Sequence, residues 1–208
     1  MNMVIVDDHA IVRIGLKQLV QDAYPYATIW EAGSGREALM LLDKVRWDLA
    51  ILDVNLPDQN GIELLKAIKM REPSLPVMML SLHPEEQYAL RALKAGAAAY
   101  LTKERAPEEL VTAIKQVLAG RKFITATLAE RLATVVFSPV EQLPHERLSD
   151  REFQVLCAIG QGKTVSAIAG DLSLSVKTVS TYRTRLLDKL QMKNTTDLIR
   201  YTLDHTLV

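Results

Sequence analysis

The sequence is poor in cysteine and in aromatic residues, and it contains no long apolar run. Its single cysteine, Cys157, excludes an internal disulfide, and the apolar neighbours in FQVLCAIG predict a small buried side chain rather than redox chemistry. No run approaches the roughly 18 apolar residues of a membrane span, and acids interrupt the amino-terminal MNMVIVDDHAIVR where a signal peptide keeps its apolar core. These absences predict a cytoplasmic protein with no membrane partner.

The chain also lacks an excess of either charge, with 25 Lys plus Arg against 25 Asp plus Glu in 208 residues. The basic side chains are unevenly placed, because residues 177–200 hold 6 of them against 2 acidic ones. This local excess is compatible with a nucleic-acid-binding face and equally with a solvated helix. The length suits one large or two small globular domains.

Five short apolar runs alternate with helix-period segments in residues 1–122. Each run is too short for a helix, and most lack the polar alternation of a strand exposed on one face. The pattern predicts a doubly wound α/β domain, in which helices cover both faces of a parallel sheet. The predicted strands are 3–7, 27–31, 49–53, 76–81 and 98–102.

Helix boundaries in this part carry local signals. Ser34 and Glu37 have the spacing of a capping box, and Pro84 and Pro107 suit the first turn of a helix. Gly96 is placed to end one.

Polar residues recur where the predicted strands end, which is the edge where doubly wound domains hold their functional sites. They are Asp7, Asp8, Asp53, Ser81 and Lys103. Any one of them alone is compatible with a residue that faces water or caps the next helix. Their recurrence at matching ends of four strands favours a shared site.

A cluster of three carboxylates and an amine favours one chemistry. Carboxylates a few ångströms apart repel one another, so their ionisation requires a cation or a raised pKa. Oxygen ligands favour a hard ion such as Mg²⁺. With Mg²⁺ and Lys103 neutralising charge, Asp53 can attack a phosphoryl group and form an acyl phosphate. Ser81 could hydrogen-bond the phosphoryl oxygens while Lys103 pairs with them.

Residues 1–122 resemble the receiver domain of two-component response regulators. The matching motifs are VDDH, LDVNLPDQNG, MLSLH and AAYLTK at the successive strand ends. The resemblance implies a flavodoxin-like (βα)5 fold and a sensor histidine kinase that phosphorylates Asp53. It implies that Lys103 contacts the phosphoryl group and that Mg²⁺ is bound by Asp7, Asp8, Asp53 and the backbone carbonyl of Asn55.

The same resemblance makes Ser81 and Tyr100 a hydroxyl and aromatic switch that rearranges on phosphorylation. It also implies that the Asn55 and His83 positions influence the lifetime of the acyl phosphate. We predict that His83 lies near the path of water to the phosphoryl group, the alternative being an ordinary surface histidine. His9 is predicted to be structural, because a hard ion has little use for imidazole.

Residues 123–144 change in character. They predict a linker with one short helix at about 126–136, followed by Pro139 and Pro144 among polar residues.

Residues 145–208 predict a small all-α domain of four short helices. Ser149 and Glu152 have capping-box spacing before the first helix, which ends at Gly160 or Gly162, and Asn194 caps the fourth. The second and third helices, joined by the turn SLS, have helix-turn-helix spacing. Any small helical bundle contains similar turns, so this spacing alone leaves DNA binding open.

The third helix, VKTVSTYRTRLLDKLQ, has an apolar side and a polar side. The apolar side is formed by Val176, Val179, Leu186, Leu187 and Leu190. Short polar and basic side chains are typical of a recognition helix. Arg183 falls inside the apolar arc, where its stem is expected to lie along the protein with its charge reaching outward. The predicted DNA contacts are Lys177, Thr178, Ser180, Thr181, Arg183, Thr184, Arg185 and Lys189.

Residues 148–190 are similar to the DNA-binding domain of the LuxR and NarL/FixJ regulators. The elements LSxRE, IAxxLxxSxxTV and KL stand at the spacing of that family. Two departures affect phosphate anchoring and operator sequence more than fold. Residues 165–167 read Val-Ser-Ala where the family often has Asn-Lys-Glu, and Ser180 and Tyr182 replace a Lys-x-His pair.

Together the resemblances imply a NarL/FixJ-type response regulator in which phosphorylation controls homodimerisation and sequence-specific binding to double-stranded DNA. RNA polymerase is a further implied partner, and catalysis is limited to Mg-dependent self-phosphorylation and autodephosphorylation. The fourth helix, with Leu198, Ile199, Tyr201 and Leu203, supplies either the dimer contact or core packing. The main alternative is a constitutive DNA-binding regulator whose receiver serves only as a dimerisation scaffold. A haloacid-dehalogenase-type phosphatase is disfavoured, because Asn55 stands where that enzyme needs an aspartate.

Overall fold

The computed structural model describes residues 1–126, 128–130 and 143–208. The chain divides into two compact units, Met1–Glu130 and Arg131–Val208. Residues 123–130, predicted as the start of the linker, belong to the first unit. Most of the helix predicted at 126–136, together with Pro139, lies outside the described residues. Within the described ranges, no helix has the length and apolar character needed to cross a membrane.

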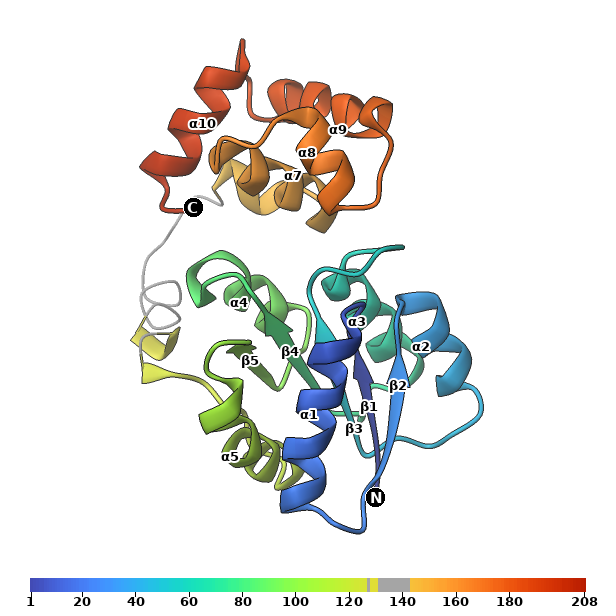
Figure 1. Cartoon of the computed structure of the whole chain (residues 1–208). Coiled ribbons are helices and arrows are strands. Elements are labelled where there is room, and N and C mark those ends of the chain that lie inside the picture. The colour runs from blue at the N-terminus through green and yellow to red at the C-terminus, as the bar shows by residue number, and fades with distance from the viewer. Residues whose placement is uncertain (127, 131–142) are drawn as a thin grey trace. The chain divides into compact units, whose positions relative to one another are not determined.

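The first unit is built on a parallel sheet of five strands in the order β2-β1-β3-β4-β5 (Figure 1). β3 and β4 are buried along their whole length, which explains why their sequences are almost purely apolar. All five strand predictions are confirmed to within a residue or two at each end. The strands are β1 (Asn2–Val6), β2 (Thr28–Ala32), β3 (Leu49–Asp53), β4 (Val77–Ser81) and β5 (Ala99–Thr102).

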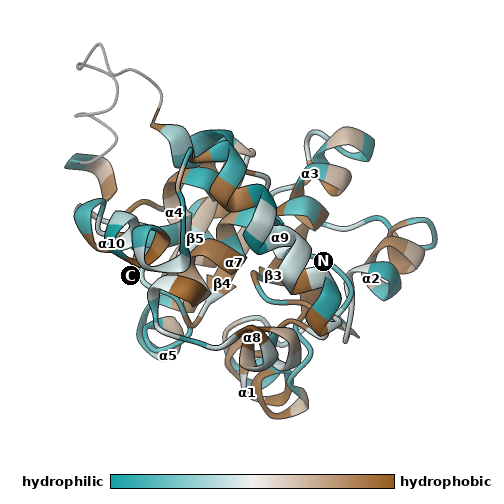
Figure 2. Ribbon diagram, turned by 90° about the horizontal axis from the view of Figure 1, so that it is seen from above, coloured by the Kyte–Doolittle hydropathy of each residue, from teal (hydrophilic) through white to brown (hydrophobic). Residues whose placement is uncertain are grey.

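Helices cover both faces of this sheet, as predicted for a doubly wound domain. α1 (Ala10–Ala23) and α5 (Ala106–Leu118) pack on one face, where their apolar residues join alternate residues of the strands in one core. The other face is covered by α2 (Gly35–Leu42), α3 (Gly61–Arg71) and α4 (Glu85–Lys94). Figure 2 shows that the helices carry both hydrophilic and hydrophobic segments, as expected for helices with one buried face.

The helix signals are largely confirmed, with one correction. The Ser34 hydroxyl accepts a hydrogen bond from the Glu37 backbone N–H, but the Glu37 carboxylate accepts from Gly33 at 2.6 Å instead of from Ser34. The capping box predicted there is therefore only half formed. Pro107 lies in the first turn of α5, Pro84 directly precedes α4, and Gly96 ends α4 with φ +101°.

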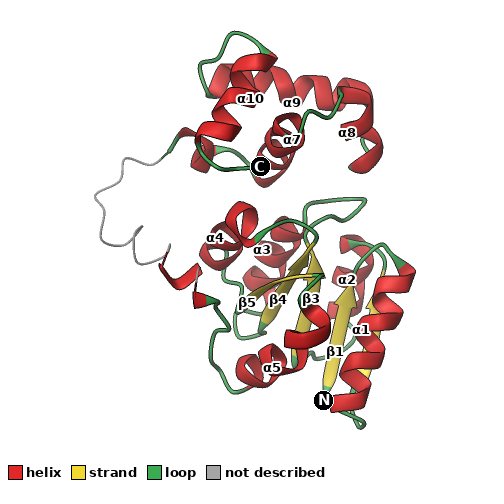
Figure 3. Cartoon of the chain, turned by 60° about the vertical axis from the view of Figure 1, so that its left-hand side comes forward, coloured by secondary structure: helices red, strands yellow, loops and turns green. Residues whose placement is uncertain are grey.

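In residues 143–208, the described part of the second unit, four α-helices form a bundle preceded by a short 3-10 turn, η1 (Pro144–Arg147) (Figure 3). The predicted capping box of Ser149 and Glu152 is fully formed, and Asn194 caps the last helix as predicted. Cys157 is a buried free thiol, in agreement with the sequence. The helices are α7 (Asp150–Gly160), α8 (Val165–Asp171), α9 (Val176–Lys189) and α10 (Thr195–Asp204).

Candidate functional site

Three carboxylates meet at the carboxyl edge of the sheet. β1 and β3 are adjacent and parallel with Val6 opposite Leu52, so that Asp7 and Asp53 follow at neighbouring positions. Ligand atoms of Asp7, Asp8, Asp53 and His9 all lie within 4.8 Å of one another. Asp7 and Asp53 are buried, whereas the Asp8 side chain is 38% exposed. A hard cation would therefore find two fixed carboxylates and one that borders solvent.

Lys103 brings a positive charge to this acidic site. It follows β5, and its backbone N–H donates to the Ser81 carbonyl at the end of β4 (2.8 Å). Its Nζ atom lies 2.6 Å from Oδ2 of Asp7 and 2.7 Å from Oδ2 of Asp53. The ammonium thus bridges the two buried carboxylates and offsets much of their mutual repulsion.

The environment of Asp53 changes its acidity. The pKa of Asp53 is raised to about 6, because burial and the nearby charge of Asp7 raise it by more than Lys103 and the Asn55 N–H lower it. Burial alone would lower the pKa of Lys103, but Asp53 and Asp7 hold it above its usual value. Lys103 therefore stays protonated, while Asp53 is a carboxylate at neutral pH that is held at some cost in free energy.

The loop after β3 is tightly folded around Asp53. The Asn55 backbone N–H donates to the Asp53 carboxylate, and Asn55 pairs with Asn60 in an isolated antiparallel bridge. The Gly61 N–H donates to the Val54 carbonyl (2.7 Å), and a Cβ at Gly61 would lie 1.9 Å from the Asp53 carbonyl oxygen. Only glycine fits at position 61, so that the end of the loop lies directly against the strand end.

The predicted switch residues form a connected group beside the carboxylates. The Ser81 hydroxyl accepts from the His83 backbone N–H (3.0 Å), and the Tyr100 hydroxyl donates to the His83 carbonyl (3.1 Å). Tyr100 is 1% exposed, so its ring lies inside the receiver, and its predicted role as a switch stays a prediction. The His83 ring contacts Asn55 (Nε2 to Nδ2, 3.2 Å) and the Tyr88 ring.

Two side chains near the acidic site were assigned no part in it by the sequence. Arg13 donates from Nη1 to the Asp7 carbonyl (2.7 Å) and pairs with Glu31, which places a second cation beside β1. No sequence motif identifies Arg13 as part of the site, although α1, which carries it, begins two residues after Asp8. His9 Nδ1 lies 2.7 Å from Asp8 and 3.3 Å from Asp7, so the imidazole contacts both carboxylates, and its predicted structural role stays a prediction.

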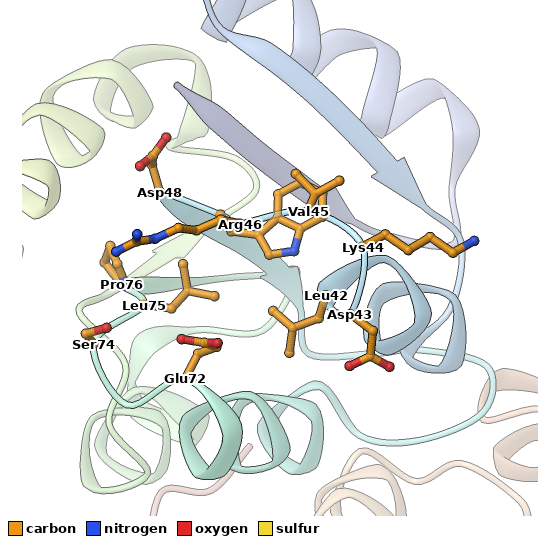
Figure 4. A pocket seen from close by; sticks show the side chains of 11 residues that line it. Leu42, Asp43, Lys44, Val45, Arg46, Asp48, Glu72, Ser74, Leu75 and Pro76 are labelled. Atoms are coloured by element: carbon orange, nitrogen blue, oxygen red, sulfur yellow. The ribbon is translucent and has the colours of Figure 1, made fainter.

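A hollow of about 600 Å³ lies at the amino-terminal ends of β3 and β4, opposite the acidic site (Figure 4). Its lining includes Asp48, just before β3, and Pro76, just before β4, so it lies at the far ends of these strands from Asp53. Acidic and basic side chains are mixed around it, and this mixture favours no single class of ligand. The lining residues are Leu42, Asp43, Lys44, Val45, Arg46, Trp47, Asp48, Glu72, Ser74, Leu75 and Pro76.

α9 in the second unit presents the predicted polar side to solvent. Lys177, Thr181, Thr184 and Arg185 are exposed, and the remaining predicted DNA contacts on this helix include the half-buried Thr178, Ser180 and Arg183. The Thr178 hydroxyl is bound to Ser175, which caps the helix. A shallow hollow of about 250 Å³ is lined by Lys177, Thr178, Thr181, Tyr182 and Arg185. Tyr182 was not among the predicted contacts, although it follows Thr178 by one helical turn.

The apolar side of α9 agrees with the sequence except at Val176. Val179, Leu186 and Leu190 are buried and Leu187 is half-buried, but Val176 is 51% exposed. As the first residue of α9, Val176 points its side chain back past the end of the helix, beyond the packed bundle. Arg183 is half-buried, and its Nε atom is buried without a hydrogen-bond partner among the described residues, so the outward reach predicted for its charge stays a prediction.

Lys189 has a partner inside the protein. Its Nζ atom lies 2.7 Å from Oε2 of Glu152, the carboxylate that closes the capping box of α7. Burial alone would raise the pKa of Glu152, but hydrogen bonds from Lys189 and Ser149 hold it below its usual value. This lysine therefore stabilises the bundle, and its predicted DNA contact stays a prediction.

Four residues of α10 were predicted to serve either core packing or a dimer contact, and they differ in burial. Leu198 is fully buried, whereas Leu203 is 60% exposed. The Tyr201 hydroxyl lies 2.9 Å from Nδ1 of His145 and so ties α10 to η1. Ile199 is half buried.

Comparison with known proteins gives the same two-part division. Residues 3–115 match the response regulator receiver domain, and residues 146–202 match the luxR family of bacterial regulatory proteins. Response regulator UvrY of Escherichia coli (strain K12) is 32% identical over 207 residues, covering 99% of this chain and 95% of UvrY. Response regulator GacA of Pseudomonas aeruginosa is 33% identical over 207 residues, covering 99% of this chain and 97% of GacA.

Among solved structures, RcsB from Salmonella enterica serovar Typhimurium, bound to promoter rprA in the presence of phosphomimetic BeF3⁻, is similar with a TM-score of 0.65. It is 27% identical, and the match covers 97% of each chain. The matches span both units and include the acidic site as well as α9. The chain therefore belongs to the two-component response regulators that join a receiver domain to a LuxR-family DNA-binding domain.

Proposed function

We propose that this protein is a transcription factor that a sensor histidine kinase switches by phosphorylating Asp53. The observation that carries the proposal is the bridge of Lys103 between Asp7 and Asp53, with Asp8 alongside, in a chain that also has a LuxR-family DNA-binding domain. DNA binding by itself does not require an acidic site of this kind. Phosphoryl transfer to a carboxylate does, because it needs the carboxylate, a cation and charge compensation.

Phosphorylation forms a bond between a carboxylate oxygen of Asp53 and phosphorus as the bond to the donor's leaving group breaks. At neutral pH Asp53 is ionised, as a nucleophile must be, because its pKa is about 6. Lys103, already 2.7 Å from this carboxylate, pairs with the added oxygens. Ser81 is one residue beyond Leu80, which lies opposite Asp53 in the sheet, and its hydroxyl hydrogen-bonds a phosphoryl oxygen.

The donor set fits Mg²⁺. The ligands would be Asp7, Asp8, Asp53 and the backbone carbonyl of Asn55, all oxygens. When bound, the ion would supply charge neutralisation and an oriented contact to phosphate. The chain's own part is self-phosphorylation and autodephosphorylation, and Asn55 together with His83 sets the rate at which water reaches the acyl phosphate.

The second unit reads promoter DNA as a homodimer. α9 enters the major groove with Lys177, Thr181, Thr184 and Arg185 outward, joined by Thr178, Ser180, Arg183 and Lys189 at its margins. Support comes from the polar exposure of this helix and from RcsB, of which one solved structure contains two dimers bound to two parallel DNAs. The exposed Leu203 on α10 is the dimer contact, and RNA polymerase is a further partner of the DNA-bound protein.

The domain boundaries belong to the same proposal. The receiver spans 1–122, a linker with a short helix spans 123–144, and the DNA-binding domain spans 145–208. The matches to 3–115 and 146–202 support this division.

One experiment tests the switch. Wild type, Asp53→Asn and Asp43→Asn are incubated with Mg²⁺ and acetyl phosphate, and mass and promoter binding are followed together. Asp43 is 72% exposed and distant from the site, so its variant is the matched control. Wild type and Asp43→Asn should gain one phosphoryl group and bind DNA more tightly, while Asp53→Asn should do neither.

The alternative is a constitutive regulator whose receiver is only a dimerisation scaffold. It predicts that phosphorylated and unphosphorylated wild type bind DNA equally. Equal gain of phosphate by Asp53→Asn would also overturn the proposal, because the phosphoryl group would then reside elsewhere.

A further inference from the structure

Glu85, the first residue of α4, is a buried carboxylate held from two sides. It is only 8% exposed, although it directly follows the loop in which His83 binds the switch residues Ser81 and Tyr100. One of its oxygens accepts from Nη1 of Arg105 (3.4 Å), just before α5. The other accepts from the hydroxyl of Thr125 (2.5 Å). An ionised group at this depth depends on both donors, because a buried carboxylate without partners is costly.

Thr125 belongs to the segment that leaves the receiver toward the DNA-binding domain. Two residues earlier, the Phe123 N–H donates to the Ala98 carbonyl (3.0 Å), so this segment begins along the edge of β5. Thr125 then starts a helical turn, since its carbonyl accepts from Ala129 and its hydroxyl oxygen accepts from the Leu128 N–H. One hydroxyl therefore both caps the departing turn and binds Glu85.

Glu85 is also tied to the switch. Only Pro84 separates it from His83, whose N–H and carbonyl bind Ser81 and Tyr100 respectively. Proline fixes its own φ and restricts the residue before it, so the loop end and the first turn of α4 are stiffly joined. A rearrangement at Ser81 or Tyr100 therefore displaces the Glu85 carboxylate as well, because the joint at Pro84 is stiff.

We propose that Glu85 is a positioning residue that couples the phosphoacceptor site to the interdomain segment through the Thr125 hydroxyl. The inference rests on the proposed phosphorylation switch and names the route by which its state leaves the receiver. When the loop after β4 changes arrangement, Thr125 either follows the carboxylate or loses it, and the turn that begins at Thr125 changes with it. By linkage, the state of this turn biases the loop in return.

A merely structural contact makes a different prediction. An anchor that holds residues 121–130 equally in both states changes stability but leaves the effect of phosphorylation on DNA affinity intact. A coupling contact changes that effect. The quantity to measure is therefore the ratio of DNA dissociation constants without and with phosphorylation.

The test uses the full-length protein with Mg²⁺ and acetyl phosphate. Thr125→Val removes the hydroxyl and keeps the shape, Thr125→Ser restores the hydroxyl, and Glu85→Ala removes the acceptor. We expect Thr125→Val and Glu85→Ala each to lower the ratio at least threefold, and their combination to lower it no further. Thr125→Ser should stay within twofold of wild type. Asp53 should take up phosphate in all of them.

Amide hydrogen exchange over residues 123–130 supplies a readout that is independent of DNA. In wild type and Thr125→Ser, phosphorylation should change the exchange of this segment, and in Thr125→Val it should not. If the variants keep both the wild-type ratio and the wild-type exchange response, the inference is wrong and the switch stands. If phosphorylated wild type shows no change in DNA affinity, the proposed function fails, and an exchange response that still depends on the Thr125 hydroxyl would support the coupling alone.

Discussion

The Nζ atom of Lys103 lies 2.7 Å from Oδ2 of Asp53, and both side chains are less than a tenth exposed. The contact lowers the pKa of Asp53, yet burial outweighs it and the pKa stands at about 6 instead of the ordinary 3.8. Asp53, the proposed phosphoacceptor, is thus a carboxylate at neutral pH at a cost in stability. This cost can be measured through its dependence on pH.

Asp53→Asn should stabilise the unphosphorylated receiver at neutral pH in the absence of Mg²⁺. Below about pH 4 Asp53 is protonated in both the folded and the unfolded chain, and the variant should gain nothing. As pH rises from 4 to 6 the folded protein keeps a proton that the unfolded chain has lost, so wild-type stability falls. Above pH 6 the unfolding free energy of Asp53→Asn should exceed that of wild type by its full amount, up to about 2–3 kcal/mol.

Urea unfolding of both proteins at several pH values checks this expectation. Asp43→Asn, at an exposed carboxylate, should follow wild type at every pH. A stability gain for Asp53→Asn that is constant from pH 4 to pH 8 would contradict the explanation from the raised pKa.

Gly61→Ala should be among the most damaging small substitutions in the receiver. The new Cβ would overlap the Asp53 carbonyl oxygen, 1.9 Å away in backbone that cannot move without displacing the strand end. We expect a loss of about 2–4 kcal/mol in unfolding free energy and slower phosphorylation. Gly15→Ala is the matched control, because Gly15 is exposed in α1 with no atom within 4 Å of a Cβ.

The unfolding free energy of the control, Gly15→Ala, should rise by about 0.5–1 kcal/mol, because alanine favours a helix more than glycine does. Thermal unfolding measures both changes. If Gly61→Ala unfolds at the wild-type temperature, the loop is not held as closely as the geometry indicates.

Much of the fold was predictable because most strands are short, mainly apolar runs between clear helix and turn signals, β2 with Thr28 and Glu31 being the exception. The convergence of Asp7, Asp53 and Lys103 followed from the same pattern, since parallel strands end at one edge. The two-part organisation was equally visible, because both units carry motifs of fixed spacing.

What the sequence did not predict depends on contacts between residues far apart. Glu85 and Thr125 are 40 positions apart. No sequence motif predicts that the first residue of α4 and a residue of the segment after the receiver share a hydrogen bond. Lys189 was assigned to DNA because a basic residue on a recognition helix has that role by default, but a buried carboxylate lies within its reach. Val176 was assigned to the apolar side because helical periodicity does not show where a bundle ends.

His83→Ala should shorten the lifetime of the acyl phosphate. The ring lies against Asn55 (3.2 Å) and Tyr88, beside the loop that surrounds Asp53, so its removal opens a path for water. We expect hydrolysis at least about threefold faster, equivalent to about 0.7 kcal/mol in the barrier. Leu82→Ala, at an exposed position of the same loop, should leave the rate unchanged. Loss of the phosphoryl group over time is followed by mass, and an unchanged half-life in His83→Ala would make this histidine an ordinary surface residue.

Lys177→Met and Lys189→Met should separate DNA contact from internal stabilisation on the same helix. Lys177 is exposed at the start of α9, so its loss should weaken binding to all sequences and reduce the slope of log affinity against log salt by about 1. Lys189 pairs with the buried Glu152, so its loss should lower the unfolding free energy of the second unit by about 1–2 kcal/mol and reduce the salt slope by less than the loss of Lys177 does. Salt titrations of DNA binding and urea unfolding measure the two effects. A reduced slope with wild-type stability in Lys189→Met would show instead that this lysine leaves Glu152 for a phosphate when DNA binds.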